Sequence, residues 1–128
     1  MNEDCLRHGA FSWNELMTTD VAAARQFYGE LFGWETEDYC GGGTNYVLIK
    51  VNGEPVGGLM ASPPECTGMP PSWGVYVTVA DVDATARQVE VLGGTLLRPP
   101  ADIPDVGRFC VLRDPQGATL CAISYRKS

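Results

Sequence analysis

Histidine and basic residues are scarce in this chain of 128 residues. It has one histidine, His8, in a polar lead-in, and nine Lys and Arg against sixteen Asp and Glu, for a formal net charge of −7 at pH 7. Binding to nucleic acid or to an anionic membrane requires a basic surface that neutralises phosphates. We therefore expect neither partner, and small molecules or proteins are the better candidates.

Long apolar runs and paired cysteine motifs are also missing. No run approaches the ~20 apolar residues of a membrane span, and the first ten residues lack the basic start and apolar centre of a signal peptide. The five cysteines form an odd set without a CxxC spacing, which argues against a disulfide framework and a zinc knuckle. We expect a cytoplasmic protein with reduced thiols.

What the chain does have is one unit used twice. The first copy, residues 9–34, reads as a strand, an Asp20 cap and a helix that ends at Gly33. The second copy begins at residue 72 and has Asp81 as its cap. The predicted buried stripes of the two helices are Val21, Ala24, Tyr28 and Leu31 in the first and Val82, Thr85, Val89 and Leu92 in the second.

Three further strands follow each predicted helix. After the first helix they are residues 35–39, 46–51 and 56–60, with a glycine loop at 41–43 and a hairpin at Asn52-Gly53. After the second they are 95–98, 109–113 and 119–125, with a proline-containing loop after residue 98 and a type I turn at 114–117. Each half is thus βαβββ, and the chain is one α+β domain with modules at 9–61 and 72–126 and a linker at 62–71.

These patterns together resemble the vicinal oxygen chelate superfamily, which includes glyoxalase I, extradiol dioxygenases and the fosfomycin and bleomycin resistance proteins. The resemblance covers nearly the whole chain and is carried by TTDVAAARQFYGELFGW, VADVDATARQVEVLGG and GRFCVLRDPQGATL. It implies that the two modules form a U-shaped mixed sheet, here called the cup, with helices on the outer face. It also implies a divalent metal inside the cup. We expect a homodimer, and the modules could pair within one chain or by exchange between two chains.

The metal positions of the superfamily are not matched by donors in this chain. They fall on Trp13 and Gly74 in the first strand of each module, near Gly57 in the fourth strand of the first and on Cys121 in that of the second. A site of this kind needs three or four His, Glu or Gln donors. We therefore predict no metal and no other cofactor.

The remaining candidate site residues are those that strand alternation and the resemblance place in or near the cup. Glu15 and Tyr76 are candidates for acid–base work, although a salt-bridged carboxylate and a core tyrosine are the plain alternatives. The predicted ligand-binding residues are Trp13, Glu15, Trp73, Tyr76, Arg108 and Cys121. For Arg108 an ordinary surface role, and for Cys121 a buried inert thiol, are the alternatives.

Three functions from different classes follow. The first is a metal-independent protein that binds a small organic molecule in the cup, as in the bleomycin-resistance branch. The second is a lyase, isomerase or dioxygenase-type enzyme with a non-standard site. The third is a protein-interaction domain. The missing metal donors favour the first, because fold resemblance alone does not establish catalysis.

Overall fold

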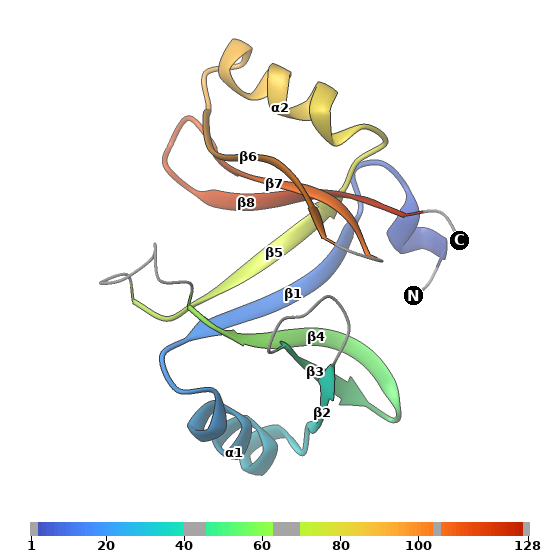
Figure 1. Cartoon of the computed structure of the whole chain (residues 1–128), viewed down its shortest axis with the longest axis vertical. Coiled ribbons are helices and arrows are strands. Elements are labelled where there is room, and N and C mark those ends of the chain that lie inside the picture. The colour runs from blue at the N-terminus through green and yellow to red at the C-terminus, as the bar shows by residue number, and fades with distance from the viewer. Residues whose placement is uncertain (1–2, 40–45, 63–69, 104–105, 127–128) are drawn as a thin grey trace. The chain divides into compact units, whose positions relative to one another are not determined.

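The computed structural model describes residues 3–39, 46–62, 70–103 and 106–126, and Figure 1 shows the course of the chain. The predicted order of elements is confirmed. The elements are η1 (Glu3–Leu6), β1 (Phe11–Thr18), α1 (Val21–Phe32), β2 (Glu35–Tyr39), β3 (Tyr46–Val51), β4 (Glu54–Ala61), β5 (Ser72–Thr78), α2 (Val82–Val91), β6 (Thr95–Ile103), β7 (Gly107–Arg113) and β8 (Thr119–Tyr125).

The strands form a mixed sheet in the order β2-β3-β4-β1-β5-β8-β7-β6. Each βαβββ module has the same topology, because its first strand pairs in parallel with its fourth and the other neighbours are antiparallel. The α+β fold with two such modules is therefore as predicted. The closing of the modules into a U-shaped cup, and the division at residues 61 and 72, stay predictions.

Residues 14–74 form one compact unit. Its core consists of Leu16, Val47, Ile49 and Leu59, against which Val21, Ala24, Tyr28 and Trp34 pack. Leu16 faces α1, as the alternation of β1 predicts. The hairpin between β3 and β4 has positive φ at both Asn52 and Gly53, the geometry that an Asn-Gly turn favours.

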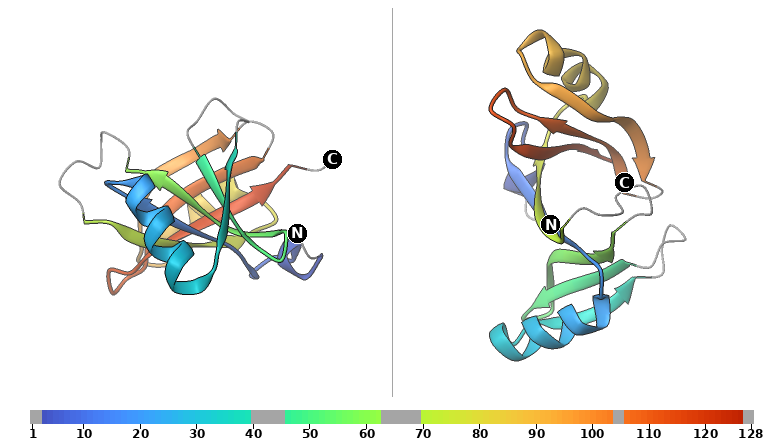
Figure 2. Two further views of the ribbon diagram at one scale, coloured as in Figure 1. Left: turned by 90° about the horizontal axis from the view of Figure 1, so that it is seen from below. Right: turned by 90° about the vertical axis from the view of Figure 1, so that its left-hand side faces the viewer.

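Residues 1–13 and 75–128 form the second unit. Here α2 lies against one face of β6, β7 and β8 (Figures 1 and 2). The core on this side consists of Val79, Val82, Ala86, Cys110 and Ala122. The first residues join this unit, because the Gly9 N–H donates to the Thr78 carbonyl and the Thr78 N–H donates to the Ala10 carbonyl.

The predicted helix stripes are wrong at their C-terminal ends. Leu31 is 57 % exposed and Leu92 is 72 % exposed. Gly33 ends α1 with a left-handed φ of 74°, and Trp34, just beyond it, packs against the core. In α2 the buried residues are Val82, Ala86 and Val89, so Ala86 rather than Thr85 continues the stripe.

The predicted loop at Pro99-Pro100 is also wrong, because β6 runs through it to Ile103. β6 is an edge strand, where a residue without an N–H breaks no second ladder. The pairing with β7 shifts register between Leu96 and Arg98 and again between Arg98 and Ala101. These irregularities accommodate the prolines within the strand.

Some expectations lie outside the described residues, namely the glycine loop at 41–43 and most of the linker, residues 63–69. Cys40 and Cys66 lie there as well. The described cysteines, Cys5, Cys110 and Cys121, are free thiols. Neither α1 nor α2 is long and apolar enough to cross a membrane.

Candidate functional site

Three of the predicted ligand-binding residues lie together on the sheet face opposite α2. Tyr76 and Cys121 are buried there with Ile123, and Trp13 packs against them. The parallel pairing of β5 and β8 sets Tyr76 directly beside Cys121. The next residue of β8, Ala122, faces α2, so alternation alone decides which residues of β8 join this cluster.

The same face carries aromatic residues that the sequence analysis did not select. Phe109 and Tyr125 pack against the cluster together with Ile103, Val106 and Val111, and we call the whole set the aromatic face. The rings of Phe109 and Tyr76 are 6.4 Å apart, and the guanidinium carbon of Arg98 lies 5.1 Å from the Phe109 ring centroid. Alternation along 107–113 and 119–125 would have indicated Phe109 and Tyr125, since both share a face with Cys121.

Tyr125 gives the aromatic face a polar edge. Its hydroxyl lies 2.7 Å from the Ser12 hydroxyl, and either group can donate. Burial raises the pKa of Tyr125 above its ordinary value of 10, although the bond to Ser12 partly opposes the shift. The phenol is therefore uncharged at neutral pH and can both donate and accept.

Glu15 is buried in the unit formed by residues 14–74, with 7 % of its surface exposed. Its neighbour Leu16 faces α1, so Glu15 points to the other side of the sheet. In the parallel pairing with β4, Glu15 lies opposite Gly58. Tyr46 occupies the space over Gly58, because a Cβ added there would meet the phenol ring and its oxygen.

Trp73 belongs to the unit formed by residues 14–74. Its ring lies 5.4 Å from that of Tyr28 and 6.0 Å from that of Trp34, and its indole N–H donates to the Tyr28 hydroxyl at 3.3 Å. Trp73 is 43 % exposed. It belongs to an aromatic group built around α1, on which Phe32 also stacks.

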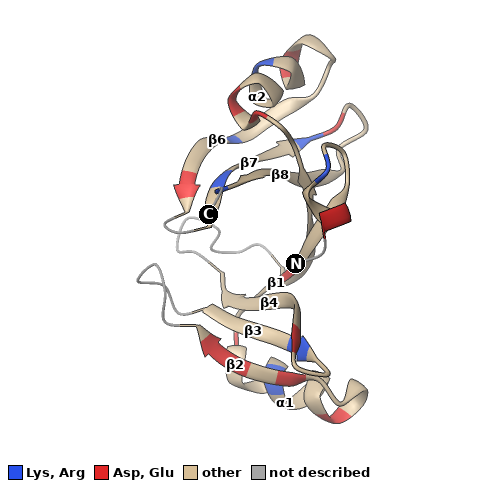
Figure 3. Cartoon of the chain, turned by 90° about the vertical axis from the view of Figure 1, so that its right-hand side faces the viewer, with Lys and Arg blue, Asp and Glu red and all other residues tan. Residues whose placement is uncertain are grey.

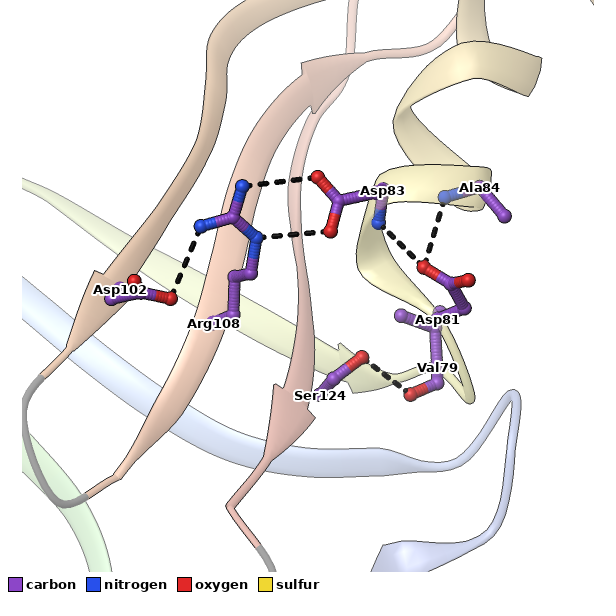
Figure 4. Close-up of polar contacts among 7 residues, drawn as sticks. All are labelled: Val79, Asp81, Asp83, Ala84, Asp102, Arg108 and Ser124. Carbon is purple, nitrogen blue, oxygen red and sulfur yellow. Dashed lines mark hydrogen bonds and ion pairs between the residues drawn. The ribbon is translucent and has the colours of Figure 1, made fainter.

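Arg108 lies on the side of β7 that faces α2 (Figure 4). Its Nε and Nη2 donate to the two carboxylate oxygens of Asp83, both at 3.0 Å, and its Nη1 donates to Asp102 at 3.1 Å. Asp83 stands in the first turn of α2, where Asp81 accepts from the N–H groups of Asp83 and Ala84. In this arrangement Arg108 ties the start of α2 to β7 and β6.

The residues at the superfamily's metal positions do not fit a divalent ion. Trp13 and Gly74 have no donor side chain, and at Gly57 a Cβ would lie 2.8 Å from the Asn14 carbonyl oxygen, so the backbone leaves no room for a ligand there. Within the described ranges, no three His, Cys, Asp or Glu residues gather closely enough to hold a metal.

Proteins from Mycobacterium and Streptomyces are similar to this chain. It is 43 % identical over 117 residues to "Putative glyoxylase CFP32" of Mycobacterium tuberculosis and 34 % identical over 125 residues to the anthracycline biosynthesis protein DauV of Streptomyces sp. strain C5. These matches cover 89 % and 86 % of this chain. The chain spans 45 % of the length of either relative.

Among solved structures, methylmalonyl-CoA epimerase from Mycobacterium tuberculosis has a TM-score of 0.64 at 19 % identity, covering 99 % of this chain and 94 % of the other. The hypothetical protein BH1468 from Bacillus halodurans C-125 has a TM-score of 0.69 at 10 % identity, covering 95 % and 98 %. At such identities the likeness concerns the fold. Residues 10–122 match the sequence pattern of one superfamily over most of the chain, and the chain therefore belongs to the glyoxalase/bleomycin resistance protein/dioxygenase superfamily.

Proposed function

We propose that this protein binds a small organic molecule on the aromatic face, without a metal. The observation that carries the proposal is the gathering of Trp13, Tyr76, Phe109 and Tyr125 on the sheet face opposite α2. Aromatic surfaces with a few placed polar groups are typical of small-molecule sites. The relative named for anthracycline biosynthesis is consistent with an aromatic ligand.

The polar groups of the aromatic face fit recognition better than nucleophilic catalysis. The hydroxyls of Tyr125 and Ser12 form one pair, and Tyr76 supplies a second phenol. The one thiol of this face, Cys121, is buried beside Tyr76 rather than at a helix N-terminus, where a thiol would be activated. A ligand would therefore be held by ring contacts and hydrogen bonds.

The experiment is a ligand screen on the ¹⁵N-labelled full chain by nuclear magnetic resonance. Binding should move the amide signals of Tyr76, Phe109 and Cys121 and leave most of α2 unchanged. A Tyr76→Phe variant keeps the ring and removes the hydroxyl, so it should weaken ligands by about 0.5 to 1.5 kcal/mol. Trp73→Phe is the matched control, because Trp73 belongs to the other aromatic group. If ligands move the signals around Trp73 instead, the proposed face is wrong.

A second candidate function is acid–base catalysis by Glu15, favoured by the burial of that carboxyl group on the sheet face away from α1. A buried carboxyl group is often tuned toward a working acid or base. The relative named as a glyoxylase is consistent with an enzyme. Turnover of any substrate by the purified chain, abolished in Glu15→Gln with the fold retained, would establish this function in place of simple binding.

A further inference from the structure

Arg98 is a basic residue at the border of the aromatic face. It stands in the edge strand β6, and its guanidinium carbon lies 5.1 Å from the centroid of the Phe109 ring. Phe109 packs in the cluster of the aromatic face, whereas its neighbour Cys110 belongs to the core beneath α2. Arg98 therefore lies on the side of the sheet away from α2, opposite to Arg108.

Solvent reaches this border of the face. Arg98 is exposed, and Phe109 and Val111 beside it are half-buried. Arg98 of β6 pairs with Val111 of β7, which in turn pairs with Cys121 of β8, so a row of side chains leads from the guanidinium into the aromatic face. Adjacent strands are about 4.8 Å apart, so the row spans about 10 Å, similar to the length of a small aromatic acid.

The hydrogen-bonding capacity of Arg98 is available to a ligand. The contact with Phe109 takes up at most one side of the planar guanidinium, which carries five N–H donors. In the part of the chain that the structure describes, the ion pairs involve other basic residues, and Asp102, the acidic residue of β6, accepts from Arg108. Two parallel N–H groups of a guanidinium match the two oxygens of a carboxylate.

The charge of this unit permits an anionic ligand. Residues 14–74 contain eight of the sixteen Asp and Glu and two of the nine Lys and Arg, which leaves eight acidic and seven basic residues for residues 1–13 and 75–128. The unit that carries the aromatic face is thus close to neutral, although the whole chain has a net charge of −7. Figure 3 shows basic segments on β6 and β7 of this unit.

We propose that Arg98 recognises the anionic group of the ligand and that the ligand is an aromatic carboxylate. The inference rests on the proposed function, that the aromatic face binds a small organic molecule, and adds the class of ligand. The carboxylate accepts hydrogen bonds from the guanidinium, and the aromatic ring lies on Phe109 and Val111. The contact with Phe109 orders the long side chain of Arg98 before binding, which reduces the entropy lost when the ligand binds.

The test compares three probes that share a phenyl ring and a three-carbon chain and differ in charge: cinnamate, cinnamamide and cinnamylamine. Each is titrated into the ¹⁵N-labelled full chain at neutral pH and low salt, and the amide signals of Arg98, Phe109 and Val111 are followed. Cinnamate should bind about tenfold more tightly than cinnamamide, a difference of about 1.4 kcal/mol, and cinnamylamine should bind most weakly. Added salt should reduce the preference, because Arg98 is exposed.

Variants separate Arg98 from general charge. Arg98→Gln should remove the preference for cinnamate over cinnamamide. Arg98→Lys keeps the charge without the planar fork, so it should retain only part of the preference. Arg87→Gln is the matched control, because it removes one positive charge from an exposed position of α2, on the other side of the same sheet. It should leave the order of the probes unchanged.

The outcomes distinguish this inference from the proposed function. Cinnamamide binding as tightly as cinnamate, or a preference that survives Arg98→Gln, overturns the inference. If all three probes move the signals of the aromatic face with equal affinity, the proposed function stands and the role of Arg98 is rejected. If cinnamate moves the signals of α2 instead, it binds another arginine and the inference is rejected. If no probe moves any signal of the folded chain, both are rejected.

Discussion

Among single residues, Gly58 shows how a missing side chain makes room for a neighbouring ring. The absence of a Cβ lets the Tyr46 phenol lie on the backbone beside Glu15. Glu15 was predicted as a site residue from strand alternation and the family resemblance together, and it is buried on the face away from α1. Tyr46 was not predicted, because the contact of its phenol with Gly58 depends on the pairing of β3 with β4.

Gly58→Ala should therefore destabilise the fold by about 1 to 3 kcal/mol, as overpacked positions do. The added methyl would collide with the Tyr46 phenol, and the ring would have to leave the place that it occupies over Gly58. Chemical denaturation measures the loss. Gly74→Ala is the control, because the nearest atom to its new Cβ is 3.9 Å away, and it should cost little. Combining Gly58→Ala with Tyr46→Ala should recover part of the loss, and equal stability of the single and double variants would contradict this explanation.

Asp83 makes stability depend on acidity in a predictable direction. The hydrogen bonds from Arg108 lower the pKa of Asp83 below its ordinary value of 3.8. A group with a lowered folded-state pKa stabilises the fold above its unfolded pKa, and this contribution is lost as pH falls through the folded value. Asp83→Asn should therefore lower the Tm at pH 7, and its difference from the parent should shrink below about pH 3.8.

Thermal unfolding of both proteins at pH 7 and pH 3 measures this change. The effect should be modest, because both side chains are partly exposed and surface pairs are screened by water. Asp102→Asn is the comparison, since it removes one bond to Arg108 and leaves the two to Asp83. A Tm difference for Asp83→Asn that is the same at both pH values would show that charge plays no part.

At the scale of elements, the caps and turns were predicted well because they are local. Asp20 accepts from the Ala23 N–H at 3.0 Å, and Asp81 accepts from the N–H groups of the first turn of α2. Asp114 accepts from the N–H groups of Gln116 and Ala118, and Gly117 has a φ of 100°. The far ends of the helix stripes were predicted poorly, because burial there depends on where the sheet lies.

Two leucines of the same unit test that distinction. Leu59 of β4 is 1 % exposed, whereas Leu31 of α1 is 57 % exposed. Leu59→Ala should cost about 2 to 5 kcal/mol, as buried leucines do, and Leu31→Ala should stay within about 0.5 kcal/mol. Denaturant unfolding gives both values. A loss at Leu31 as large as that at Leu59 would mean that this side of α1 is covered in solution.

At the scale of the whole molecule, the superfamily is established but its usual metal is not. The expected donor positions carry Trp13, Gly57, Gly74 and Cys121. We predict that protein purified by gel filtration holds no stoichiometric zinc, iron, manganese or nickel, which elemental analysis measures directly. One equivalent of metal, with activity lost to a chelator and restored by the metal, would overturn both this prediction and the binding function.

The superfamily, the order of βαβββ elements, the helix caps and the hairpin at Asn52-Gly53 could all be predicted from the amino-acid sequence. These features follow from short-range chemistry: side-chain oxygens that cap a helix, residues that favour a turn, and alternation along a strand. The continuation of β6 through Pro99-Pro100 was missed, because only the sheet order shows that this strand lies at an edge.

The contacts between the candidate site residues could be seen only in the tertiary structure. Trp13, Tyr76 and Cys121 lie in one cluster, and the parallel pairing of β5 and β8 sets the last two side by side. Arg108 forms an ion pair with Asp83 of α2, and the ring of Trp73 contacts that of Tyr28 in α1. A residue's face depends on its own strand and can be read locally, whereas its neighbours depend on register with strands far away in the sequence.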